Sequence, residues 1–142
     1  MEIITLPLEH MGLVAGVFDQ LKIAEIVDGR IPKLRNHNLE HSKVIKAMVL
    51  NGLGYIGQRL YLFSKFYEKL PIERLLGEGV KATDLNDDVL GRTLDAIYAN
   101  GPTELFNDIA LKVMNRLDFG VQSQEYNQIR CQYNRILCNQ RK

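Results

Sequence analysis

The sequence contains few cysteines, and their positions exclude a disulfide. Only two occur among the 142 residues, Cys131 and Cys138. On one helix they would share a face but lie about 10 Å apart along the axis, which is too far for a covalent bond between them. No second cysteine pair and no histidine lies nearby to complete a zinc site. We therefore expect two reduced thiols, and neither a metal ion nor a cofactor.

Long apolar runs are also missing. The most apolar stretches, Val44–Leu50 and Leu60–Tyr67, are interrupted or flanked by lysine and glutamate, so none approaches the length that spans a bilayer. The first five residues lack the basic segment of a secretory signal. These absences predict a cytoplasmic protein with no membrane partner.

Neither sign of charge is in large excess. The net charge is +1, from 18 basic and 17 acidic residues, and the overall composition, 46% apolar and 25% charged, is that of a globular protein. Residues 121–142 hold four basic residues and one acidic residue, which leaves 14 basic and 16 acidic residues in 1–120. The main body is therefore not a uniformly basic nucleic-acid clamp, although a local basic face remains open. We expect one domain over 1–120 and a polar, basic tail over 121–142 with at most a weak helix.

Apolar residues recur at three- and four-residue spacing along most of the chain, which predicts amphipathic helices. Ser42 and Asn86 are residues typical of helix N-caps, and Pro32 and Pro71 are expected to end helices. No strand-like alternation extends beyond a few residues. The sequence thus predicts an all-α fold, a compact multi-helix bundle. The expected helices cover residues 8–21, 23–31, 42–50, 59–70, 86–100 and 103–118.

Two of these helices carry faces that the spacing defines in detail. In the first, Leu13, Val17 and Phe18 are expected to face the core. In the last, Phe106 and Ile109 are expected on one apolar face.

A glycine motif follows the third expected helix. Gly52, Gly54 and Gly57 have the G-x-G-x-x-G spacing that binds a pyrophosphate. That fingerprint requires a preceding strand, whereas residues 42–50 are expected to be helical. We favour a flexible connector and expect no small-molecule ligand, and a nucleotide-binding enzyme remains an alternative that a parallel sheet after Gly57 would support.

Two groups of polar residues resemble sites but have simpler explanations. His37 and His41 are four apart, but their neighbours place them in a loop, so surface histidines are expected rather than metal ligands. Asp84, Asp87 and Asp88 could form an acidic metal cluster or a pair of catalytic carboxylates. Helix capping explains these aspartates with fewer assumptions.

Two pairs of expected helices have the order of a helix-turn-helix motif. The first pair joins 42–50 to 60–70, and the second joins 88–99 to 103–118 through a short turn at Asn100–Pro102. A recognition helix exposes basic and polar groups, but so does any solvent-facing helix. DNA contact and ordinary packing in a helical bundle therefore both remain open.

Several segments, in order, resemble a known family. They are Lys46–Tyr55, Leu60–Phe63, Pro71–Gly77, Leu85–Asp95 and Thr103–Phe106. Over about residues 6–120 the chain resembles the N-terminal helical domain, a domain of unknown function, of insertion-sequence DDE transposases of the insertion-sequence-four-like group. The series as a whole is specific, although each segment alone is not.

The resemblance implies a non-catalytic accessory domain, because the chain ends before the RNase-H-like catalytic domain of such proteins. We therefore expect no catalytic residue and a truncated or frame-disrupted copy. The expected role is binding to the transposon's terminal repeats, transposase dimerisation, or both, with a homodimer or a full-length transposase as protein partner. A protein-interaction module or an inert remnant without DNA binding is the alternative.

If DNA is bound, its phosphates are expected to contact exposed lysine and arginine side chains, which supply most sequence-independent affinity. The choice of residues depends on residue type alone. The candidates are Arg59, Lys65, Arg92, Lys112 and Arg116.

Overall fold

The structure of the chain is a computed structural model that describes residues 8–33, 38–53 and 62–117. The chain divides into two units, Met1–Ala110 and Leu111–Lys142. All regular elements in the described ranges are helices, so the predicted all-α class is confirmed. The expected tail, 121–142, lies outside the described residues. The elements are α1 (Glu9–Gln20), α2 (Ile23–Arg30), α3 (His41–Leu53), α4 (Phe63–Tyr67), α5 (Ile72–Leu76), the 3₁₀ turn η2 (Ala82–Asp84), α6 (Asp87–Asn100) and α7 (Pro102–Arg116).

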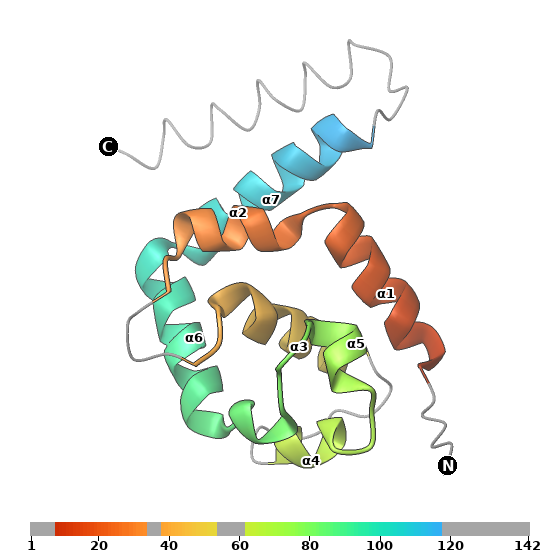
Figure 1. The fold of residues 1–142 in the computed structure, drawn as a ribbon. Coiled ribbons are helices and arrows are strands. Elements are labelled where there is room, and N and C mark those ends of the chain that lie inside the picture. Colours follow the sequence, from red (N-terminus) through yellow and green to blue (C-terminus); the bar gives the residue numbers. More distant parts are fainter. Residues whose placement is uncertain (1–7, 34–37, 54–61, 118–142) are drawn as a thin grey trace. The chain divides into compact units, whose positions relative to one another are not determined.

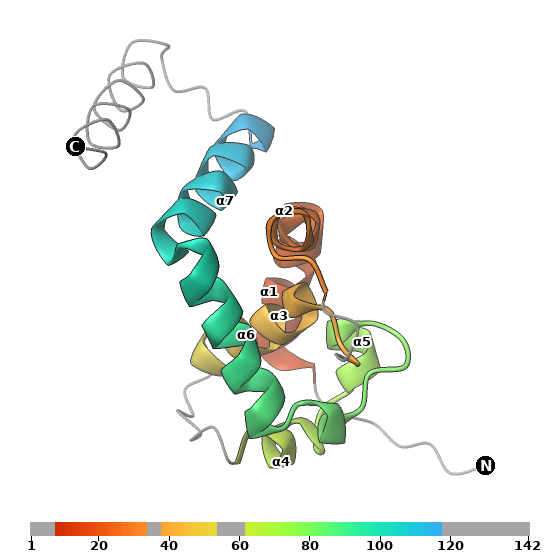
Figure 2. The ribbon, with the colours of Figure 1, turned by 90° about the vertical axis from the view of Figure 1, so that its left-hand side faces the viewer.

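The first unit is built around α3, which contacts α1, α2, α5 and α6 (Figures 1 and 2). Val44, Ala47 and Leu50 recur on one side of α3 and are almost completely buried. They belong to the main apolar cluster, with residues from α1, α4, α5 and α6. Packing against several neighbours removes much of the apolar surface of this helix from water, and this burial supplies most of its stability.

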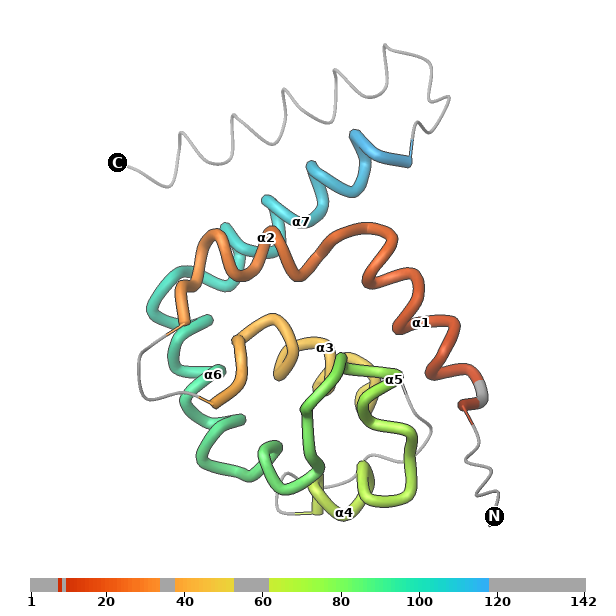
Figure 3. Tube along the Cα trace, viewed as in Figure 1, coloured from red at the N-terminus to blue at the C-terminus, as the bar shows by residue number. Residues whose placement is uncertain are grey.

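A tight bend separates α1 from α2 (Figure 3). Lys22 lies between the two helices in the left-handed conformation, with φ of 51°. This conformation costs a residue with a side chain more than it costs glycine. The bend allows α1 and α2 each to pack against α3.

A second, smaller apolar cluster joins α2 to α6 and to the first part of α7. Val27 of α2 and Ile31, the residue directly after α2, are buried against Leu105 of α7, and Ile97 of α6 packs on the same cluster. An ion pair between Arg30 of α2 and Asp108 of α7 lies beside it. The inner faces of α6 and of Pro102–Ala110 therefore serve ordinary core packing.

The segment between α3 and α6 contributes the most deeply buried aromatic residues. Phe63 and Tyr67 of α4 are both in the main cluster, with ring centroids 5.3 Å apart. The Tyr67 hydroxyl donates a hydrogen bond of 2.8 Å to the Ala47 carbonyl of α3. Burial raises the pKa of this hydroxyl well above that of an exposed tyrosine.

The boundaries of α6 follow from its end residues. The Asn86 side chain accepts a hydrogen bond of 3.0 Å from the Val89 backbone N–H, so the predicted N-cap is confirmed. Gly101 ends the helix with φ of 82°, a conformation that favours glycine. Pro102 then begins α7, where its missing N–H leaves no helical bond unmade.

The two expected helix-turn-helix pairs have different outcomes. In the first pair only Phe63–Tyr67 is helical after α3, and residues 54–61 lie outside the described residues. In the second pair α6 and α7 meet at Gly101, with a single residue between them.

Three local predictions were wrong. In α1 Phe18 is buried as expected, together with Met11 and Ala15, whereas Leu13 is 74% exposed and Val17 is also exposed. The cause is tertiary, because Asp19 of the same helix pairs with Lys46 of α3 and thereby favours the Phe18 side toward the core.

In α7 the buried residue is Leu105, whereas Phe106 is 68% exposed, although the spacing placed it on the apolar face. At the start of α3, Ser42 lies inside the first turn rather than at the cap, since the helix begins at His41. Leu105 rather than Phe106 is buried because Leu105 packs into the apolar cluster around Val27 of α2.

No helix in the described ranges is both long enough and apolar enough to cross a membrane.

Candidate functional site

The five residues expected to contact DNA do not form one described cluster. Lys65 of α4 and Arg92 of α6 are exposed, on separate helices of the first unit. Lys112 and Arg116 are also exposed, on the part of α7 that belongs to the second unit. Arg59 lies outside the described residues.

The surroundings of Arg92 on α6 are acidic. Asp87, Asp88 and Asp95 are exposed on the same helix. Their carboxylates oppose the approach of a phosphate backbone. Arg92 is therefore a single cation on an acidic helix and not part of a basic stripe.

The most exposed large apolar side chains of the first unit include two aromatic residues close to Gly101. Tyr98 of α6 is 83% exposed, and Phe106 of α7 is 68% exposed. Leu94, one turn before Tyr98 on α6, is also exposed. Large apolar side chains gathered on a surface mark sites of interaction more often than single ones do.

A second exposed apolar group lies on α1. Leu13 and Val17 are four residues apart and therefore share one face of the helix. Both side chains are aliphatic, whereas Tyr98 and Phe106 are aromatic.

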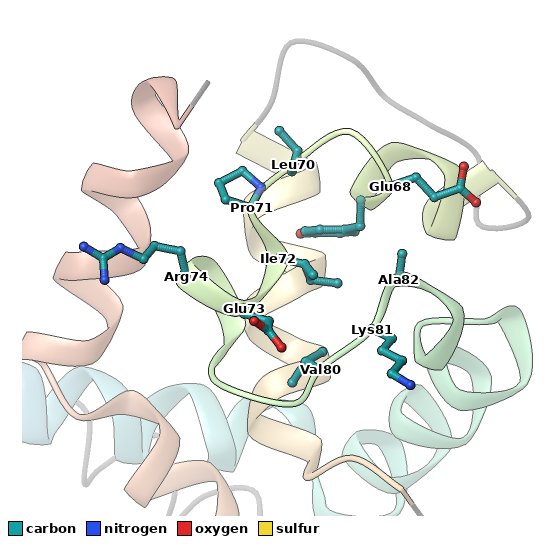
Figure 4. A pocket seen from close by; sticks show the side chains of 10 residues that line it. Glu68, Leu70, Pro71, Ile72, Glu73, Arg74, Val80, Lys81 and Ala82 are labelled. Carbon is teal, nitrogen blue, oxygen red and sulfur yellow. The ribbon is translucent and has the colours of Figure 1, made fainter. Parts of the chain in front are cut away.

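A groove of about 600 Å³ lies beside α5 (Figure 4). Its walls include Tyr67, Ile72 and Val80, and Glu73 and Lys81 also line it. The Glu73 carboxylate accepts a hydrogen bond of 3.3 Å from the Gly79 backbone N–H, so part of its bonding capacity is used to hold the loop. The opposite charges of Glu73 and Lys81 give the groove no preference for an anion or a cation.

Two buried polar residues of α3 were not predicted. The ammonium group of Lys46 lies 2.7 and 2.8 Å from the two carboxylate oxygens of Asp19, and 5.7 Å from the centre of the Phe18 ring. Its side chain is only 8% exposed. An ion pair and a cation–π contact together satisfy a charge that would otherwise be costly to bury. No sequence signal links these residues, since 27 positions separate Lys46 from Asp19.

His41 is the second of these residues, and the prediction of a surface histidine was wrong. It lies in the first turn of α3 and is almost fully buried. Its Nδ1 is 3.1 Å from the Thr93 hydroxyl, which itself donates a hydrogen bond to the Val89 carbonyl. Because Thr93 uses its only proton there, Nδ1 of His41 must be the donor to Thr93. This bond joins α3 to α6.

The other candidate polar groups are placed as follows. In the described part of the chain, no three His, Cys, Asp or Glu side chains are grouped so that they could hold a metal ion. Asp84 accepts a hydrogen bond of 2.9 Å from the Lys81 backbone N–H, while Asp87 and Asp88 lie in the first turn of α6. His37, Cys131 and Cys138 lie outside the described residues.

The glycine motif begins within a helix, because α3 continues through Gly52 to Leu53. Gly54 and Gly57 lie outside the described residues. The element before the motif is therefore a helix, where the nucleotide fingerprint requires a strand.

These features define the first unit as an all-α domain with a central helix and no metal-binding group among its described residues. Residues 3–111 match a family described as Domain of unknown function (DUF4277), and the chain belongs to that family. The match ends one residue beyond the first unit. No curated protein and no solved structure matches the chain.

Proposed function

We propose that this chain is a non-catalytic accessory domain of a transposase, and that it acts by holding transposase subunits together. Two lines of argument support the proposal. The ordered sequence segments described above resemble the N-terminal domain of insertion-sequence transposases. The first unit also exposes two large aromatic side chains, Tyr98 and Phe106, that its apolar clusters do not use.

The observation that carries the proposal is the exposure of Tyr98 and Phe106 on the two helices that meet at Gly101. Aromatic residues are enriched at protein interfaces and contribute much of their binding energy. Neither ring is needed by the two apolar clusters of the first unit, which are formed by other residues. The stability of the fold therefore does not depend on an aromatic ring at either position.

Sedimentation equilibrium of the purified chain tests the proposal. The wild-type protein is expected to show an average mass that rises with concentration, and Tyr98→Ser is expected to shift that rise to higher concentration. Leu13→Ser is the matched control, because Leu13 is similarly exposed but lies on α1. A wild-type mass equal to one chain at every concentration would contradict the proposal and favour an inert remnant or an interaction with a different protein.

The second candidate function is binding to the transposon's terminal repeats. It is favoured by Lys65, which is exposed and for which the described residues provide no ion pair. A cation that is not paired within the protein is available to a phosphate.

Fluorescence polarisation with a terminal-repeat duplex and a scrambled duplex, at two salt concentrations, tests this candidate. Lys65→Ala is expected to weaken binding to both duplexes and to reduce the salt slope by about 1. Lys22→Ala is the control, because Lys22 is paired with Glu25 at 3.4 Å. If the chain binds neither duplex, binds both equally, or binds them with an affinity that does not depend on salt, binding to the terminal repeats is contradicted.

A further inference from the structure

We draw no further inference here: the strongest candidate, the groove beside α5 that Tyr67, Ile72 and Val80 line, is bordered by charges of both signs, and nothing in the part of the chain that the structure describes shows what covers it.

Discussion

The carboxylate of Asp28, on α2, accepts two hydrogen bonds from Ser42, in the first turn of α3. One comes from the Ser42 backbone N–H at 3.1 Å and the other from its hydroxyl at 2.6 Å. The first N–H groups of a helix have no partner within the helix, and here a side chain from another helix provides one. The α3 helix is thus capped by a residue that precedes Ser42 by 14 positions, which also fixes α2 against α3.

Asp28→Ala is expected to lower the free energy of unfolding by about 1–3 kcal/mol, because it removes a cap and leaves the buried Ser42 hydroxyl without this acceptor. Asp28→Asn keeps an acceptor oxygen and is expected to lose less. Urea unfolding followed by circular dichroism measures the difference. Equal stability of Asp28→Ala and the wild type would show that the two bonds contribute nothing net.

Removing Asp19 and removing Lys46 from their ion pair are expected to destabilise the protein by different amounts. Asp19→Ala leaves the Lys46 ammonium buried without its partner and is expected to cost about 1–3 kcal/mol, less than the 3–5 kcal/mol for a fully buried pair because Asp19 is itself exposed. Lys46→Met removes the charge and keeps an apolar chain over Phe18, so it is expected to cost less than Asp19→Ala. Denaturant titrations of the two variants test this order, and the reverse order would contradict it.

Tyr67 predicts a loss of stability at alkaline pH. The pKa of its hydroxyl is raised in the folded protein because burial disfavours the tyrosinate. An unfolded chain therefore loses this proton first, so the contribution to stability is complete below a pH of about 10 and declines as the pH rises above it. The free energy of unfolding, measured in urea at several pH values from neutral upward, is expected to fall once the pH exceeds about 10.

Tyr67→Phe is the control for this pH dependence. It removes the hydroxyl and its bond to the Ala47 carbonyl, which costs about 1 kcal/mol near neutral pH. As the pH rises above about 10, the free energy of unfolding of this variant is expected to fall less than that of the wild type. If both proteins show the same alkaline decline, the decline comes from other groups.

Gly91, within α6, and Gly101, at its C-terminal end, are expected to respond oppositely to substitution by alanine. Gly101 has φ of 82°, a conformation in which a residue with a side chain is strained, so Gly101→Ala is expected to destabilise the fold by about 1 kcal/mol or more. Gly91 lies within α6 and has open space, so Gly91→Ala is expected to stabilise the fold by about 0.5–1 kcal/mol. Thermal unfolding of the two variants measures both effects, and a shift of the same sign in both would contradict this account.

The sequence was sufficient to predict the longer helices, because periodicity and end residues are local signals. The helix expected over 59–70 ends at Tyr67, and the short helix α5 was not predicted. Asn86 and Pro102 mark boundaries that the structure also has. The buried face of α1 could not be predicted, since two faces of that helix are apolar and the choice between them depends on a distant partner. Lys46 of α3 makes that choice through Asp19, and nothing in the local spacing of α1 reports it.

The candidate site was harder to predict than the fold. Residue type alone selected Lys65 and Arg92, and both are exposed. The exposure of Tyr98 had no signal in the sequence, because an aromatic residue at helical spacing is more often part of the core. Only the three-dimensional packing shows that Thr93, rather than Tyr98, points into the unit.

On the proposed function, copies of this chain associate through the exposed surface of α6 and not through that of α1. Amide resonances of the ¹⁵N-labelled chain, recorded at several concentrations from dilute to about 200 µM, test it most directly. The account predicts that shifts and broadening with concentration cluster at Gly91, Leu94 and Tyr98. Changes that cluster at Leu13 and Val17 instead, or spectra that do not change with concentration, would contradict it.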